Sequence, residues 1–349
     1  MPLINWEKLQ DLYQRDLVYA FQLEINDVCE QGCEYCYMNA PSIRQGRLSS
    51  DTLRGAISDA SDMEIYCIEW LGGEPLLRED VFKLMAFASE KGLRNNMWTG
   101  GLPLADEENA RKCVQLTEGG LISIHLSTLN PEIYQQSHPT RPIDDMYKII
   151  EGVENCLNAG KPPEMMMNST TLTSHSTAED MINIIDHFQD EYGIPTCVNV
   201  YQFYEPRSGE NIDEVLRFKP DLQTVRKVLN HLQRSAGNVS IGANCVNKQY
   251  CSATIALLND GRLTPCATIR PDDAPTIMDK GLRETFQAHR DWLVVKKLKD
   301  KENLPDGCRA CKKNDDCWGC RAKSWDYFHD IYQRDPACFM NPDNFRAVL

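Results

Sequence analysis

The sequence has no run of about 18 consecutive apolar residues, the length that a membrane-spanning helix needs. Its first thirty positions carry charged residues throughout and lack the apolar core of a signal peptide. Basic residues are also too few to balance the acidic ones, because 37 Lys and Arg stand against 51 Asp and Glu, a net charge of -14. The sequence therefore predicts a cytoplasmic protein with no membrane partner and no nucleic-acid partner.

Low-complexity bias is missing as well. With 42% hydrophobic and 25% charged residues, the composition is typical of a packed globular protein rather than of a disordered chain. At 349 residues the chain has room for about two domains, counting roughly 150 residues for each.

Cysteine is abundant. The 15 cysteines are an odd number, which excludes a complete set of intrachain disulfides and favours thiolates that bind metal. Four of them, Cys67, Cys113, Cys156 and Cys197, stand alone among apolar neighbours, and we expect them in the core. The other eleven form a group of three in one short loop and a group of eight in the last third of the chain.

The first two hundred residues alternate between strand and helix patterns. The apolar patterns predict six strands and the helices between them, the first of which has Ser50 as its N-cap. This alternation predicts a parallel sheet, either doubly wound or curled into a barrel. No G-x-G-x-x-G turn follows the first strand, which disfavours a dinucleotide-binding domain. The predicted strands are 19–25, 67–71, 95–98, 121–126, 165–170 and 197–203, and the later helices 79–90, 107–117, 146–159 and 178–192.

The first cysteine group, Cys29, Cys33 and Cys36, lies in the loop after the first strand. Three thiolates can hold three irons of a 4Fe-4S cluster and leave the fourth iron open to a chelating substrate. A zinc knuckle is the alternative, but the loop contains no histidine to complete a tetrahedral zinc site. A second turn, Gly72-Gly73-Glu74-Pro75, follows the second strand. In a barrel both loops would share one mouth.

These two motifs together, with Tyr35 directly before the third cysteine, resemble those of the radical S-adenosylmethionine (SAM) superfamily. The resemblance implies an α/β fold, a partial (β/α)6 TIM-like barrel. It also implies that the amino and carboxylate groups of SAM bind the open iron. An electron from the cluster would then cleave SAM to methionine and a 5′-deoxyadenosyl radical, which abstracts a hydrogen atom from the substrate.

The resemblance also suggests contacts to SAM. Gly72, Gly73, Glu74 and Pro75 would hold the SAM amino group, since two glycines let the backbone approach a ligand closely and the proline fixes the exit of the turn. Backbone around Tyr35 would meet the adenine. Less specific contacts follow from position alone: His125 or Ser127 for the carboxylate or ribose, and Arg141 for the carboxylate, although Arg141 is equally well explained as a surface arginine. Asn168 is a similar candidate.

The second cysteine group follows a polar, turn-rich linker at 205–213 and a helix at about 221–234. Eight thiolates make two clusters at four per cluster, with two structural zinc sites as the alternative. The spacing resembles the SPASM extension of peptide and protein maturases, which divides the chain into a barrel (1–205), a linker and helix (206–240) and an auxiliary-cluster domain (241–349). The resemblance assigns auxiliary cluster I to Cys245, Cys251, Cys266 and Cys320, and auxiliary cluster II to Cys308, Cys311, Cys317 and Cys338. The gap before Cys320 is one residue shorter than in that family, so its assignment is the weakest.

The resemblance predicts three 4Fe-4S clusters and SAM as cofactors, and a peptide or protein substrate whose side chain is crosslinked or oxidised. Sulfatase-maturating relatives carry a basic aspartate where this chain has Ala267, so the catalytic base is unassigned; Asp260, Tyr201, Tyr204, Glu205 and His125 are candidates by location only. Only about 18 residues precede the first strand, so we expect no fused leader-binding domain; either a separate protein presents the peptide or the barrel mouth recognises it.

The electron donor would be a flavodoxin or a ferredoxin. A small molecule, such as a carbohydrate or tetrapyrrole precursor, is the alternative substrate, and a non-catalytic zinc protein the alternative class.

Overall fold

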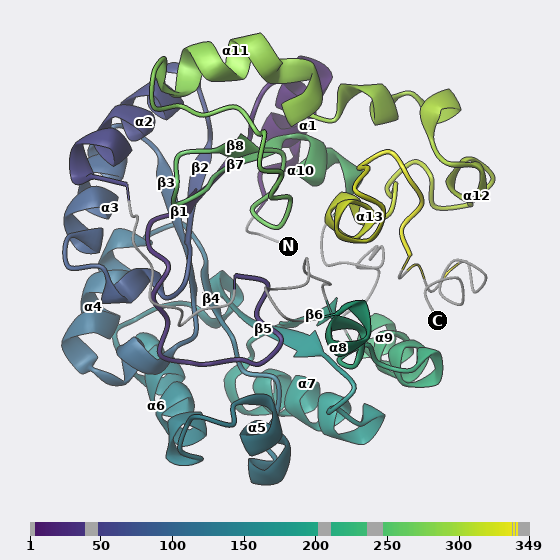
Figure 1. Cartoon of the computed structure of the whole chain (residues 1–349). Coiled ribbons are helices and arrows are strands. Elements are labelled where there is room, and N and C mark those ends of the chain that lie inside the picture. The colour runs from purple at the N-terminus through teal and green to yellow at the C-terminus, as the bar shows by residue number, and fades with distance from the viewer. Residues whose placement is uncertain are drawn as a thin grey trace.

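A computed structural model describes residues 4–38, 48–201, 211–235, 247–336, 338 and 340. Its centre is an eight-stranded sheet in the order β6-β5-β4-β3-β2-β1-β7-β8 (Figure 1). All neighbouring strands are parallel except β7 and β8. The strands are β1 Ala20–Glu24, β2 Cys67–Leu71, β3 Arg94–Thr99, β4 Ile122–Ile124, β5 Met166–Leu172, β6 Thr196–Val200, β7 Thr254–Leu257 and β8 Leu263–Thr264.

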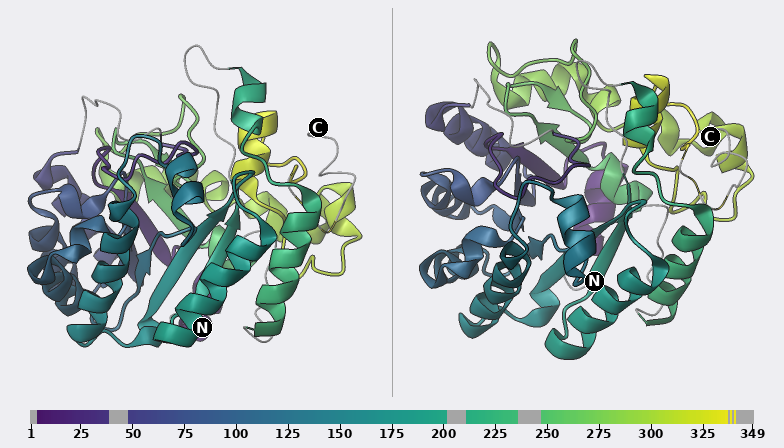
Figure 2. Two further views of the ribbon diagram at one scale, coloured as in Figure 1. Left: turned by 90° about the horizontal axis from the view of Figure 1, so that it is seen from below. Right: turned by 60° about the horizontal axis from the view of Figure 1, so that its bottom comes forward.

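The six predicted strands and the helices between them are confirmed, and with them the partial parallel barrel. Helices α2, α3, α4, α6 and α7 follow one another around the outside of the sheet (Figures 1 and 2). The first of them begins at Ser50, but its N-cap is Ser49, whose side chain accepts from Thr52 N, so the prediction of Ser50 as the cap was wrong by one residue. The helices of this half are α1 Trp6–Gln14, α2 Ser50–Asp62, α3 Val81–Glu90, α4 Glu107–Leu116, α5 Pro131–Ser137, α6 Asp144–Asn158 and α7 Ala178–Tyr192.

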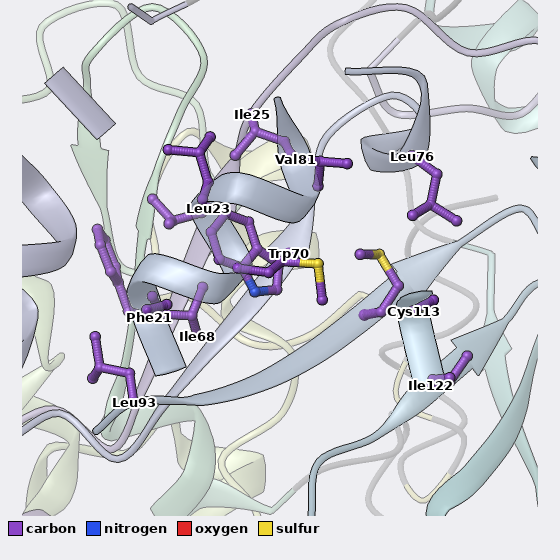
Figure 3. Packing of buried hydrophobic residues seen from close by; sticks show 14 of the residues in the cluster. Phe21, Leu23, Ile25, Ile68, Trp70, Leu76, Val81, Leu93, Cys113 and Ile122 are labelled. Carbon is purple, nitrogen blue, oxygen red and sulfur yellow. The ribbon is translucent and has the colours of Figure 1, made fainter. Parts of the chain in front are cut away.

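The main core lies between the sheet and these outer helices. Phe21, Leu23, Ile68 and Trp70 of β1 and β2 are fully buried there (Figure 3). Burying each such side chain contributes about 1.5–3 kcal/mol to folding. All four isolated cysteines are buried, which confirms the expectation that they belong to the core: Cys67, Cys113, Cys156 and Cys197.

The first strands of the last third of the chain belong to the barrel sheet, so this part does not start as a separate domain. β7 pairs in parallel with β1, Ala20 lying opposite Thr254, and β8 then pairs antiparallel with β7. These strands were not predicted, since they are short and lie between closely spaced cysteines. Helix α11 (Gly281–Leu293) also packs on α2, where Asp59 Oδ2 accepts from Leu282 N at 2.9 Å.

The remaining helices surround the open side of the barrel, where α13 and α12 lie (Figure 1). The helix expected at about 221–234 is α9, and the stretch expected to be a linker contains, in its described part, the start of α8, which Asn211 caps. Within the described ranges no helix is both long and apolar enough to cross a membrane. These helices are α8 Ile212–Leu216, α9 Leu222–Ser235, α10 Lys248–Ser252, α12 Asp306–Arg309 and α13 Arg321–Phe328.

One buried amide connects the sheet to two helices, and its loss tests this packing. Asn95 accepts from Trp70 Nε1 at 2.7 Å and donates to the carbonyls of Met85 and Leu116 at 3.0 and 2.9 Å. Asn95→Ala leaves these buried groups unpaired, which we expect to lower the free energy of unfolding by about 2–4 kcal/mol. Anaerobic denaturant titration followed by circular dichroism measures the change. Asn158→Ala, at the exposed end of α6, is the control; equal effects of the two substitutions would contradict the argument.

Candidate active site

The three-cysteine loop leaves the carboxyl end of β1 and is held at both ends by one buried arginine. Arg78 Nη1 donates to the carbonyl of Ile25 at 2.8 Å and to that of Leu48 at 3.0 Å. Its Nε donates to Asp80 at 2.7 Å, which fixes the guanidinium in this position. Sequence reasoning missed Arg78, although its place three residues after Pro75 brings it beside the loop.

The same loop packs directly against the Gly-Gly-Glu-Pro turn. Gly73 N donates to Asn26 O at 2.9 Å, and Glu74 N donates to Val28 O at 2.7 Å. The Asn26 side chain donates back to Glu74 O at 2.6 Å. A Cβ at Gly72 would lie 2.4 Å from Asn26 O, and one at Gly73 would lie 2.2 Å from Val28 O. The glycines are therefore required by contact with the cysteine loop, and their predicted contact with the SAM amino group stays a prediction.

Glu74 uses its carboxylate to join the turns after β2 and β3. Oε2 accepts from Thr99 Oγ1 and from Gly100 N, both at 2.7 Å, and Oε1 accepts from Leu76 N at 3.0 Å. Burial, with a smaller contribution from the nearby Glu30, raises the pKa of Glu74 to about 8. The side chain of Glu74 thus has a structural task, and the contact of this residue with the SAM amino group stays a prediction.

The three cysteines of the loop are each partly buried. Burial raises the pKa of the Cys33 thiol, and the neighbouring Cys36 and Cys29 thiols raise it further. Cys33 Sγ also lies 3.3 Å from His138 Nε2. No three Cys, His, Asp or Glu side chains of the described chain converge on a point that would hold a single metal ion. A four-iron cluster makes a different demand, because each thiolate binds its own iron, and three thiols of one short loop that interact with one another fit such a cluster.

The carboxyl end of β4 brings two of the predicted SAM contacts beside this loop. His125 Nε2 lies 3.0 Å from Tyr35 Oη and 3.4 Å from Ser127 Oγ. Burial lowers the pKa of His125 to about 4, so the ring is neutral at neutral pH. Ser127 Oγ also accepts from Thr171 N at 2.9 Å. Asn168, the further candidate, accepts from Leu126 N at 3.2 Å, and its buried Nδ2 has no hydrogen-bond partner in the described part of the chain.

Arg141 lies against the cysteine loop but is already paired. Its guanidinium contacts the buried carboxylate of Asp145 at 2.6 Å, and a Cβ at Gly32 would lie 3.5 Å from Arg141 Cγ. An arginine so placed can present only part of its guanidinium to a ligand, and its predicted role toward the SAM carboxylate stays a prediction.

The C-terminal cysteines surround one apolar cluster. Cys251, Cys266, Cys308 and Cys320 pack against buried residues that include Trp318. Burial raises the pKa of Cys320 to about 12, with Cys266 among the neighbours that raise it. Burial also raises the pKa of Cys308 to about 11, and there the contributing thiols are Cys317 and Cys311. The two ligand sets stay predictions, and Cys245 lies outside the described residues.

Two carboxylates that sequence reasoning missed attach this segment to the barrel. Glu24, fully buried at the end of β1, pairs with Arg270 at 2.5 Å, and Glu69 of β2 accepts from Tyr250. Among the candidates for the base, Asp260 pairs with Arg262 at 2.7 Å, and Tyr201 donates to Val215 O at 3.1 Å. Tyr204 and Glu205 lie outside the described residues.

Comparison with known proteins identifies the first half of the chain. Residues 23–188 match the radical SAM superfamily, so this part is a radical SAM domain. Among curated proteins, a probable GTP 3′,8-cyclase of Methanococcus maripaludis is 25% identical and covers 74% of this chain and 87% of its own length. An AdoMet-dependent heme synthase of Methanosarcina barkeri is 22% identical and covers 91% of this chain and 95% of its own.

Solved structures resemble the whole chain. The structure of anSMEcpe with bound AdoMet is 18% identical, has a TM-score of 0.66 and covers 94% of this chain and 95% of its own. Streptococcus suis SuiB bound to its precursor peptide SuiA is 15% identical, has a TM-score of 0.65 and covers 95% of this chain and 79% of its own. These similarities establish the fold. The match to the radical SAM superfamily covers residues 23–188, and that family implies a 4Fe-4S cluster and SAM as cofactors.

The close contact at Gly73 can be tested by adding one methyl group. Gly73→Ala places a Cβ 2.2 Å from a backbone carbonyl that cannot turn away, so we expect the loop to shift and the iron content to fall by about four per chain. Iron and sulfide analysis of anaerobically prepared protein measures this. Gly55→Ala is the matched control, because α2 leaves its Cβ without neighbours within 4 Å. Full iron content in Gly73→Ala would contradict the assigned packing.

Proposed function

We propose that this protein cleaves SAM reductively and uses the resulting radical to abstract a hydrogen atom from a residue of a peptide or protein. Cys29, Cys33 and Cys36 would hold the cluster on which SAM binds. When bound, the cluster and SAM supply a 5′-deoxyadenosyl radical. The residues of this chain build and shield the site around them: Tyr35 and His125 at one side, and the backbone of Gly72 and Gly73 at the other.

The observation that carries this proposal is the grouping of three partly buried thiols in the loop after β1, within a domain of the radical SAM superfamily. In parallel barrels this edge is where active sites lie. Buried thiols without a cation stay protonated, as the raised pKa of Cys33 indicates, and binding to iron would deprotonate them.

We further propose two auxiliary 4Fe-4S clusters that accept the electron left when the substrate radical is oxidised. Their ligands would be the two predicted sets of four cysteines in residues 241–349. The grouping of Cys266 with Cys320, and of Cys308 with Cys311 and Cys317, supports this division. Full ligation leaves no vacant iron, so these clusters would act by electron transfer, and a flavodoxin or ferredoxin would supply the first electron.

A peptide substrate is supported by the likeness to SuiB, which was solved with its precursor peptide, over 95% of this chain. The excess of acidic residues is compatible with a basic peptide. In this chain the peptide would be recognised at the barrel mouth or presented by a separate protein.

A tetrapyrrole substrate is the second candidate, because the heme synthase of Methanosarcina barkeri aligns with 91% of this chain. The radical step would be the same, and only the substrate bound in the mouth of the barrel would differ.

Removal of the three loop thiols tests the radical step. In the triple variant Cys29→Ala, Cys33→Ala, Cys36→Ala we expect no 5′-deoxyadenosine from SAM and dithionite, while about eight irons per chain remain in the auxiliary clusters. Liquid chromatography of the nucleoside and iron analysis provide both readings. The same substitution at Cys113 alone is the control, since this buried thiol lies in the helix-facing core. Unchanged 5′-deoxyadenosine formation in the triple variant, or zinc without sulfide in the parent protein, would contradict the proposal.

The substrate class can be decided by offering both candidates to the anaerobic protein. We expect a peptide encoded beside this gene to accelerate SAM cleavage and to lose hydrogen, as mass spectrometry would show. Iron coproporphyrin III, offered in parallel, should leave the rate unchanged. Consumption of the porphyrin instead, with no change in the peptide, would replace the first candidate by the second.

A further inference from the structure

A buried hydrogen-bond network on the inner face of the sheet joins the barrel to the C-terminal segment. Its centre is Glu69 of β2, whose side chain is 3% exposed. Gln22 of β1, its neighbour in register, donates through Nε2 to Glu69 Oε2 at 2.9 Å. Tyr250 of α10 donates its hydroxyl hydrogen to Glu69 Oε1. Both carboxylate oxygens therefore accept a hydrogen bond, one from the barrel and one from the segment beyond it.

The network ends beside two of the cysteines assigned to auxiliary cluster I. Tyr250 directly precedes Cys251 in α10. Gln22 Oε1 accepts from the backbone of Ala267 at 3.1 Å, and Ala267 directly follows Cys266. The same carboxylate thus positions two chain segments, one at Cys251 and the other at Cys266, fifteen residues later in the sequence.

Glu69 has hydrogen-bond partners and no basic partner. None of the ion pairs in the described residues involves it, whereas Glu24 on the same face pairs with Arg270. Burial raises the pKa of Glu69, and the hydrogen bonds from Tyr250 and Gln22 lower it. The two hydrogen bonds are therefore what connects Glu69 to the segments around it.

We infer that Glu69 is a positioning residue for auxiliary cluster I: its hydrogen bonds fix the Cys251 and Cys266 segments against the barrel, and loss of these bonds shifts the reduction potential of that cluster. The inference rests on the proposed function. Charge and hydrogen bonds close to an iron–sulfur centre are among the factors that set its potential.

Glu69→Gln tests this with almost no change in volume. A glutamine can still accept from Tyr250, but it then presents its amide NH₂ group to Gln22. Gln22 must rotate its own amide to accept that hydrogen, which turns its NH₂ group toward Ala267 N and breaks the link to the Cys266 segment. Tyr250→Phe keeps the carboxyl group of Glu69 and removes only the link to α10. Tyr66→Phe is the control, because this ring stacks on Tyr19, 4.9 Å away, within the same aromatic group.

The measurements are made on the full chain carrying alanine at Cys29, Cys33 and Cys36, so that only auxiliary clusters contribute. In Glu69→Gln we expect one of two electron paramagnetic resonance signals to change and its midpoint potential to shift, or its four irons to be lost from a chain that circular dichroism shows to be folded. Tyr250→Phe should change the same signal with a smaller shift in potential, and Tyr66→Phe should change neither.

Unchanged signals and potentials in both Glu69→Gln and Tyr250→Phe would overturn the inference, as would equal changes in Tyr66→Phe. A parent chain that holds no auxiliary clusters would instead overturn the proposed function, so the two failures are distinguishable. Iron and sulfide analysis of the parent protein, done first, separates them.

Discussion

The contact between the cysteine loop and the Gly-Gly turn is the constraint on which the site depends. At Gly72 and Gly73 the two backbones lie closer than any side chain allows, and three hydrogen bonds between the segments fix them there. Because each segment leaves the carboxyl end of a neighbouring parallel strand, the pairing of β1 with β2 brings them together. Arg78 then fixes both ends of the loop that carries the three thiols.

Buried carboxylates connect the loops of this barrel to one another. Glu74 joins the turns after β2 and β3, Glu24 pairs with Arg270, and Glu69 joins β1 and β2 to α10. Each is almost fully buried, where an ionised group is costly unless it is paired or hydrogen-bonded. The hydrogen bonds that offset this cost also fix the segments that carry the cysteines. These three carboxylates therefore have structural roles. None of them is assigned as the catalytic base, which the sequence also left unassigned.

The sequence was sufficient to predict those strands and helices that a single local pattern determines. The six strands of the first half were predicted because each is a short segment with apolar residues between helical patterns. Helix α7 has the predicted bounds because Thr177 caps it and Gly193 ends it in a left-handed conformation. Strand β7 was missed because four residues among cysteines carry little pattern. The tasks of Arg78 and Glu69 could not be predicted, since each depends on groups that are distant in sequence. The assigned cluster ligands and SAM contacts remain predictions that the structure makes reasonable.

Strand β1 joins the two halves of the chain. Its side chains alternate, with Phe21 and Leu23 in the helix-facing core and Gln22 and Glu24 on the opposite face, as the two-residue period of a strand requires. It pairs with β2 on one side and with β7 on the other, and it ends in the cysteine loop. A shift of one residue in this strand would exchange its two faces and remove both carboxamide and carboxylate from their partners. The apolar core on one face therefore sets the spacing between the cysteine loop and the C-terminal cysteines on the other.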